Sequence, residues 1–176
     1  MAKARLRHIA MSVRDPWKTA EFYKQAFGMT EAGETDGSLA EGVFLTDGVI
    51  NLALLAFESD EAAQGLGKDY VGLHHIGFWV DDPHKAQADF EAAGGTWLMG
   101  EAPVRGGGFY EIKMNDPNGV IVDLSHHGWG GAQSNPGEAD NATVPPGERV
   151  ERFAARRDAA RAEMAARVKE PVDADD

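Results

Sequence analysis

The 176-residue sequence contains no cysteine. This absence excludes disulfide frameworks, zinc–thiolate sites and cysteine nucleophiles. The chain also lacks an apolar run approaching the roughly 20 residues that a helix needs to span a bilayer. The N-terminal segment MAKARLRHIAMSV is basic, but it has no apolar core of the kind found in signal peptides. We therefore expect a cytoplasmic protein.

Basic side chains are scarce. Lys and Arg number 17 against 29 Asp and Glu, which gives a formal charge of −12 at pH 7. Nucleic acids and anionic membranes are bound by concentrated Lys and Arg, so we expect neither as a partner. Hydrophobic residues make up 43% and charged residues 26% of the chain, a balance that fits a globular protein.

The clearest pattern in the sequence is an internal repeat. RHIAMSVRDPWKTAEFYKQAFGM (7–29) matches HHIGFWVDDPHKAQADFEAAGGT (74–96), so that His8 corresponds to His75. In each copy an alternating apolar run predicts a strand. The Asp-Pro pair that follows predicts the start of a helix, because Asp caps a helix and Pro fits its first turn.

Further strands follow each predicted helix. EGVFLTDGVINLALLAF and FYEIKMNDPNGVIVDLSHH each contain apolar runs on either side of a turn signal. A unit with one helix cannot cover both faces of its own sheet, so two units must pair. We predict an α+β fold in which two paired βαβββ modules form a curved mixed sheet around a cavity, followed by a C-terminal helical arm. The sequence leaves open whether the modules pair within one chain or across a dimer.

The expected boundaries are a first module over residues 1–65, a second over 66–128, a linker or arm over 129–147, and a C-terminal helix with an acidic tail over 148–176. The helix has strong helix formers but only a thin apolar stripe, which favours a solvated or weakly docked helix. The alternative is an arm that clasps a second subunit. We expect a homodimer.

Strand alternation separates the two histidines of LHHIGFWVDDP. His75 corresponds to His8 and lies on the inner face of the sheet. His74 falls on the face that carries the apolar core, at the start of the strand, where it can reach solvent or a neighbouring carbonyl. In the last strand of each module, Asn51 and Asp123 occupy matching positions. Asp123 is a carboxylate in an apolar run and needs a partner. Two imidazoles, a carboxylate and an amide oxygen are suited to a first-row divalent metal.

Four other side chains are candidates for binding substrate or for catalysis. Trp79 shares the inner face with His75, where it either stacks on a substrate or forms plain cavity wall. Arg105 and Tyr110 lie in the Gly-rich stretch VRGGGFYE, read either as a lip over the cavity or as an ordinary connection. As part of a lip, Arg105 steers an anionic substrate and Tyr110 acts as acid or base. Alternation after Asp123 directs His127 towards the cavity mouth, although an exposed pair with His126 is the plainer interpretation.

Residues 6–128 resemble the vicinal oxygen chelate superfamily, which includes glyoxalase I, methylmalonyl-CoA epimerase, extradiol dioxygenases and the bleomycin and fosfomycin resistance proteins. RHIAMSVRDPWKTAEFYKQAFGM, HHIGFWVDDP and NDPNGVIVDL carry the resemblance. It implies paired βαβββ modules and one divalent metal ion per site, either Fe, Ni, Zn, Co or Mn, held by His8, His75 and Asp123. Asn51 stands where glyoxalase I has a glutamate and the epimerase has a glutamine. Because the Asn side chain is shorter, Asn51 either binds the metal or contacts one of the metal ligands instead.

The resemblance implies three functions, each involving a small oxygenated organic molecule. The preferred one is glyoxalase I-like lyase or epimerase/isomerase chemistry through a metal-stabilised enolate, with Asp123 at the position of the glyoxalase base. The second is Fe(II)-dependent extradiol dioxygenation, which Lys113 disfavours because these enzymes usually have a tyrosine at that position. The third is a non-catalytic resistance-type binding protein, which has no need of a ligand triad.

Overall fold

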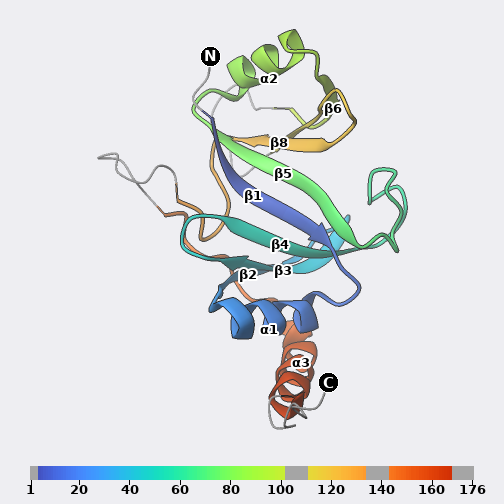
Figure 1. Cartoon of the computed structure of the whole chain (residues 1–176), viewed down its shortest axis with the longest axis vertical. Helices are drawn as coiled ribbons and strands as arrows, with labels where there is room; N and C mark the ends of the chain where they lie inside the picture. The colour runs from blue at the N-terminus through green and yellow to red at the C-terminus, as the bar shows by residue number, and fades with distance from the viewer. Residues whose placement is uncertain (1–3, 102–110, 134–142, 168–176) are drawn as a thin grey trace, which may run out of the picture.

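The structure is a computed structural model that describes residues 4–101, 111–133 and 143–167. Within these residues, eight strands form one mixed sheet in the order β2-β3-β4-β1-β5-β8-β7-β6 (Figure 1). The first module consists of β1 (Ala4–Ser12), α1 (Pro16–Phe27), β2 (Thr30–Asp36), β3 (Ala40–Thr46) and β4 (Asn51–Phe57). The second consists of β5 (Gly72–Val80), α2 (Pro83–Ala92), β6 (Thr96–Met99), β7 (Ile112–Asn115) and β8 (Ile121–Ser125).

The predicted architecture is confirmed: each half is a βαβββ module, and the two modules join edge to edge. β1 pairs in antiparallel fashion with β5, with Ala10 opposite His75. Within the modules, β1 pairs in parallel with β4, and β5 with β8. The two modules that meet at this junction belong to the same chain, so the site between them is built within one subunit.

The parallel pairs of the two modules differ in register. In the first module His8 lies opposite Asn51. In the second, His75 lies opposite Ile121, and Asp123 lies opposite Gly77 two residues further on. The sequence match of Asn51 with Asp123 is therefore not the register of the sheet, and the two side chains approach their histidines from different directions.

The helices begin as the sequence predicts. The Asp15 carboxylate accepts a hydrogen bond from the Lys18 backbone amide at 3.0 Å, and Asp82 caps α2 in the same way through the Lys85 amide at 2.9 Å. Such caps satisfy amides that lack a partner within the helix. The repeated Asp-Pro motif thus determines where both helices start.

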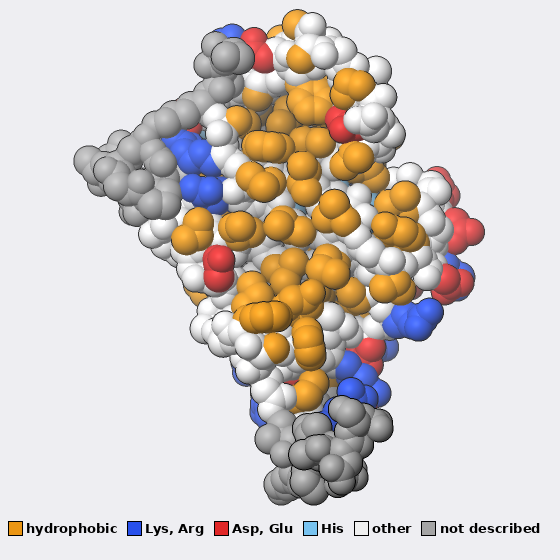
Figure 2. Space-filling view, viewed as in Figure 1, with side chains coloured by type: hydrophobic (Ala, Val, Ile, Leu, Met, Phe, Trp, Pro, Cys, Tyr) orange, Lys and Arg blue, Asp and Glu red, His pale blue; other side chains and the backbone are white. Residues whose placement is uncertain are grey.

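The outer face of the sheet carries the hydrophobic core, as alternation predicts. One cluster lies under α1 and another under α2. Hydrophobic side chains also gather across the middle of the face seen in Figure 2, whereas charged side chains lie mainly towards its edges. The first cluster includes Ile9 and Met11 of β1 and Val13 just after it, and the second includes Ile76, Phe78 and Val80 of β5. The opposite face is thereby left for a site.

The C-terminal region docks on the first module. A short 3-10 turn, η1 (Glu151–Phe153), leads into α3 (Ala154–Arg167), which lies against α1 (Figure 1). Phe153 is buried, and its ring centroid lies 4.6 Å from that of Trp17. Phe153 at the start of this region is therefore part of the core. Most of α3 is exposed and only Ala160 within it is buried, which agrees with the weakly docked helix that the sequence predicts. None of the helices described is long and apolar enough to cross a membrane.

Candidate metal centre

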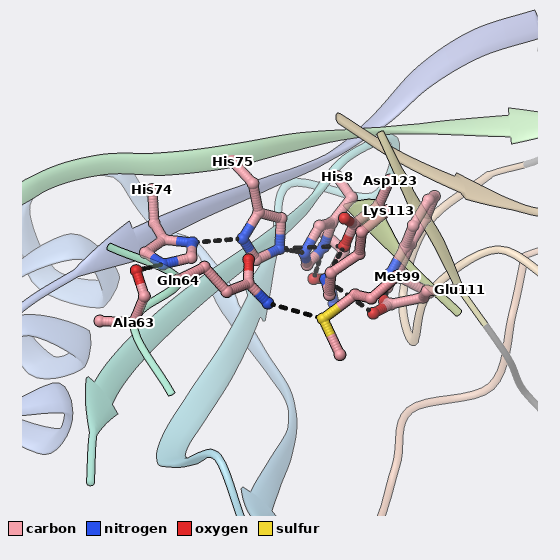
Figure 3. Close-up of polar contacts among 11 residues, drawn as sticks. His8, Ala63, Gln64, His74, His75, Met99, Glu111, Lys113 and Asp123 are labelled. Carbon is pink, nitrogen blue, oxygen red and sulfur yellow. Dashed lines mark hydrogen bonds and ion pairs between the residues drawn. The ribbon is translucent and has the colours of Figure 1, made fainter. Parts of the chain in front are cut away.

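Three buried side chains converge on the inner face where the modules meet: His8 from β1, His75 from β5 and Asp123 from β8. One donor atom from each lies within 4.8 Å of the other two. His8 Nε2 is 3.1 Å from His75 Nε2, and His75 Nε2 is 3.2 Å from Asp123 Oδ2 (Figure 3). The structure thus brings together the three residues that the sequence predicted as metal ligands.

The tautomer of His8 follows from its neighbours. Asn51 Nδ2 donates a hydrogen bond to the carbonyl of Gly130 at 2.7 Å. The other end of this amide, Oδ1, therefore faces His8 Nδ1, 2.8 Å away, and must accept its proton. Burial lowers the pKa of His8 to about 4, so the ring is neutral at pH 7 and its Nε2 carries a lone pair.

His75 is oriented in the same way, through His74. The carbonyl of Ala63 lies 3.1 Å from His74 Nε2 and requires a proton on that atom. In a neutral ring His74 Nδ1 is then an acceptor, and it receives the proton of His75 Nδ1 at 2.8 Å. Burial lowers the pKa of both histidines, that of His75 well below its usual value. His75 Nε2 therefore also presents a lone pair.

The residues fit a divalent metal ion. Two imidazole lone pairs that face each other at 3.1 Å repel unless a cation lies between them. An ion with ligands at about 2.1 Å separates neighbouring donors by roughly 3.0 Å in octahedral and 3.4 Å in tetrahedral geometry. The spacings of His75 Nε2 from His8 Nε2, 3.1 Å, and from Asp123 Oδ2, 3.2 Å, lie between these values. Asp123 Oδ1 is buried without a hydrogen-bond partner. Two histidines and one carboxylate are a donor set of first-row divalent metals.

Lys113 is a second cation at this centre. Its ammonium lies 2.6 Å from Asp123 Oδ2 and 3.2 Å from Glu111 Oε2. Burial lowers the pKa of Lys113, but the two carboxylates outweigh this effect and hold the pKa above its usual value. Burial raises the pKa of Asp123 to about 7, although the ammonium opposes the shift. With both carboxylates ionised, the three groups carry one net negative charge, which a metal ion can offset.

A cavity of about 300 Å³ opens onto this centre. His8, His75, Glu111 and Lys113 form its polar end, and its apolar wall consists of Leu39, Phe44, Leu55 and Phe57. Apolar walls with a few convergent polar groups are typical of small-molecule sites. The arrangement suits a ligand with an oxygen-bearing end at the centre and a hydrophobic remainder.

The other predicted site residues lie elsewhere. Trp79 is partly buried and packs over Gly128, since a Cβ added to Gly128 would lie 2.3 Å from the Trp79 ring. Among the described residues that line the cavity, Trp79 does not occur. His127 is exposed beside His126, with ring centroids 5.3 Å apart. Arg105 and Tyr110 lie outside the described residues.

The predicted face of His74 is wrong, because the sheet is irregular at this point, although the ring does reach a neighbouring carbonyl, that of Ala63. In the β1–β5 ladder Ala10 pairs with His75 and Met11 with Leu73, so His74 has no partner of its own. Such a bulge inserts an unpaired residue and redirects side chains. His74 consequently lines the cavity beside His75 and stacks on Phe57, with ring centroids 4.2 Å apart.

Three further members of the site went unrecognised in the sequence: Glu111, Lys113 and Trp129. Glu111 and Lys113 are two residues apart at a predicted strand. This spacing places both side chains on one face of the sheet, and it is the sequence pattern that could have identified them. Trp129 lies in the segment expected to be a linker or arm. Its ring stacks on His8 with centroids 4.7 Å apart, and its Nε1 donates to Glu111 Oε1 at 2.7 Å.

This fold and this centre define a paired-module protein with a candidate site for a divalent metal. Residues 5–124 match the Glyoxalase/Bleomycin resistance protein/Dioxygenase superfamily, and the chain belongs to this family. A "Probable lactoylglutathione lyase" of Vibrio cholerae is 30% identical over 132 residues, which cover 70% of this chain and 91% of the relative.

Solved structures show the same relationship. A methylmalonyl-CoA epimerase variant from Streptomyces coelicolor, in complex with 2-nitronate-propionyl-CoA, is 27% identical with a TM-score of 0.57 and covers 69% of this chain and 95% of its own. A hypothetical protein from Bacillus halodurans is 21% identical with a TM-score of 0.58, covering 70% and 94% respectively. This second likeness concerns the fold alone.

Proposed function

We propose that this protein is a divalent-metal-dependent enzyme of the lyase or epimerase/isomerase type, which moves a proton next to a carbonyl group of a small oxygenated substrate. The observation that carries the proposal is the approach of His8 Nε2 to His75 Nε2 at 3.1 Å, with Asp123 Oδ2 3.2 Å from His75 Nε2. Similarity to a lactoylglutathione lyase and to methylmalonyl-CoA epimerase supports this class of reaction.

The metal would be held by His8 Nε2, His75 Nε2 and the Asp123 carboxylate. When bound, a divalent ion polarises substrate oxygens and stabilises negative charge that develops when a proton leaves carbon. Three protein ligands leave positions for the oxygens of a substrate. Asn51 is engaged with His8 and Gly130, so we assign it to orienting His8 rather than to the metal.

Glu111 is the best candidate for moving the proton. Asp123, the base inferred by position, is fully buried and is bonded to Lys113. The Glu111 carboxylate instead lines the cavity and is held by Trp129 and Lys113. Lys113 lines the cavity as well, and its ammonium is placed to bind a substrate oxygen that becomes negative. Tyr110 remains a candidate acid or base on sequence grounds.

A second candidate function is Fe(II)-dependent extradiol dioxygenation. The observation that favours it is the donor set, since two histidines and one carboxylate are the ligands of many non-haem Fe(II) oxygenases. This function ranks below proton transfer because Lys113 occupies the position where extradiol dioxygenases usually have a tyrosine.

The test is metal analysis of protein purified without added metal, followed by assays of the loaded protein. For proton transfer we expect about one metal ion per chain. We also expect metal-dependent exchange of substrate protons with D₂O, which NMR detects on a panel of 2-oxo thiol adducts and acyl thioesters. Iron together with O₂ uptake on catechols would establish the dioxygenase instead. If the wild-type protein contains no more metal than a His75→Ala variant, the proposal of an enzyme fails and a non-catalytic binding protein is the remaining interpretation.

A further inference from the structure

The segment that follows the family match enters the metal centre. The match ends at residue 124, whereas Trp129 and Gly130 both contact groups of the site. Trp129 is 5% exposed, and it lies flat on the His8 ring at an interplanar angle of 11°. A segment that sequence composition assigns to a linker or arm thus forms one wall of the site.

Trp129 joins two parts of the centre that come from different modules. Its ring covers His8 of β1, and its Nε1 donates to Glu111 at 2.7 Å, next to β7. Gly77 of β5 makes room for this arrangement, because a Cβ at this position would lie 2.7 Å from the Trp129 ring and 2.8 Å from His8 Cβ. The indole therefore restricts the His8 ring and the Glu111 carboxylate together.

Gly130 acts on His8 through Asn51. The amide of Asn51 has a donor end and an acceptor end, and the Gly130 carbonyl binds the donor end at 2.7 Å. If the amide were reversed, its NH₂ group would face His8 Nδ1, and the proton of the neutral ring would move to Nε2. A protonated Nε2 cannot bind a metal. The carbonyl of Gly130 thus selects the tautomer that presents a ligand.

The chain that follows Gly130 is held on the first module. Thr46 Oγ1 donates to the Gly131 carbonyl at 2.9 Å, and the Gln133 amide donates to the Val49 carbonyl at 3.1 Å. Further along, the Val150 amide donates to Glu34 at 2.6 Å, and Phe153 is buried against Trp17. The position of the segment is therefore determined by the fold rather than by a ligand.

We propose that residues 128–133 are a site-completing segment, in which Trp129 is a positioning residue and the Gly130 carbonyl, acting through Asn51, selects the metal-binding tautomer of His8. The proposal rests on the proposed function insofar as it concerns a metal, but its structural content concerns the metal-free protein. Outer groups that orient a metal ligand typically change metal affinity 10- to 100-fold when they are removed.

The first experiment observes His8 directly. Nitrogen-15 NMR of the imidazole rings in metal-free protein at pH 7.5 distinguishes a proton on Nδ1 from one on Nε2. We expect His8 to carry its proton on Nδ1 in the wild type and in Trp129→Phe, which keeps a flat ring over His8. Trp129→Leu and Asn51→Ala should each give a mixture of the two tautomers. Trp97→Leu is the matched control, because Trp97 is 50% exposed and distant in the sheet order from β1.

The second experiment measures Zn²⁺ affinity of the same variants by calorimetric titration. Trp129→Leu should bind Zn²⁺ 10- to 100-fold more weakly, Trp129→Phe within about threefold of the wild type, and Trp97→Leu as the wild type does. If Trp129→Leu does not fold, Thr46→Val takes its place, since it loosens the segment at Gly131 without altering Trp129, and a loss of tautomer selection is again expected.

The outcomes separate this inference from the proposed function. A folded Trp129→Leu or Thr46→Val protein with the wild-type His8 tautomer and wild-type Zn²⁺ affinity would overturn the positioning role. If the wild type itself binds no Zn²⁺, the proposed function fails, while the NMR comparison still decides whether the segment orients His8.

Discussion

His8 Nε2 and His75 Nε2 face each other at 3.1 Å across the junction of the two modules. The Nδ1 atom of each ring is hydrogen-bonded to another side chain, Asn51 for His8 and His74 for His75, and this bond orients the ring. The repeat therefore supplies two equivalent histidines, but different outer residues orient them. This asymmetry leads to predictions that distinguish the two halves of the site.

Replacing His74 should weaken metal binding without removing a ligand. His74→Phe deletes the acceptor that receives the proton of His75 Nδ1, so that His75 is free to carry the proton on Nε2 instead. We expect a 10- to 100-fold loss of Zn²⁺ affinity, measured by calorimetric titration. His84→Phe on exposed α2 is the control. An affinity unchanged by His74→Phe would mean that this relay does not orient His75.

Removal of the Lys113 ammonium should destabilise the metal-free protein and strengthen metal binding. Lys113→Met leaves two buried carboxylates without their cation, at a cost of about 3–5 kcal/mol, and it also removes a competitor of the metal for Asp123. Urea unfolding with EDTA and with Zn²⁺ measures both effects. Lys85→Met, at an exposed pair with Asp89, should change stability by less than about 1 kcal/mol. Equal stabilisation by Zn²⁺ in wild type and Lys113→Met would argue against competition.

The stability of the metal-free protein should depend on pH through His8. Its pKa is about 4 in the folded state, against the usual value of 6.5. The unfolded chain therefore binds the extra proton between these pH values, and stability rises with pH across this window. The difference corresponds to about 3 kcal/mol. Asp123 opposes this trend, because its pKa is raised to about 7 and the folded state binds its proton more tightly.

Asp123→Asn should expose the His8 effect. Urea unfolding of this variant in EDTA should show stability falling by about 3 kcal/mol or more from pH 6.5 to pH 4, with His75 adding to the trend because its pKa is also lowered. The wild type should change less over the same range. Stability of Asp123→Asn that does not change with pH would show that the histidines are not buried as neutral rings.

Gly77 should tolerate no side chain. Gly77→Ala places a methyl group 2.7 Å from Trp129 and 2.8 Å from His8 Cβ, and such overpacking typically costs about 1–3 kcal/mol. Because Trp129 or His8 must move, Zn²⁺ affinity should fall as well. Gly37→Ala is the control, since its nearest contact, Thr35 Oγ1, is at 3.5 Å. Thermal unfolding and Zn²⁺ titration check both effects, and a stable Gly77→Ala protein with full affinity would contradict them.

The periodic parts of the site were accessible from the sequence. Alternation along a strand and a repeated motif together place His8 and His75 on one face, and the carboxylate of Asp123 in an apolar run indicates a buried partner. These inferences hold because side-chain direction in a regular strand depends only on sequence position. They fail at His74, where an unpaired residue in the ladder breaks the alternation.

The register of strands that are distant in sequence belongs to the tertiary structure. The repeat aligns Asn51 with Asp123, yet the sheet places Asn51 opposite His8 and Asp123 opposite Gly77. Likewise, Lys113 reaches Asp123 only because β7 pairs with β8. No local pattern encodes these pairings, since they are determined by how whole strands fit against one another.

The two βαβββ modules, the caps of their helices and the three candidate metal ligands can be read from the amino-acid sequence, because each depends on local periodicity, local hydrogen bonds or duplication. The folded chain was needed to see that both modules of one chain form the site, that Lys113 is bonded to Asp123, and that Trp129 and Gly130 lie at the centre beside His8 and Asn51. These relationships join residues separated along the chain, and packing and hydrogen bonding in the folded state alone bring them together.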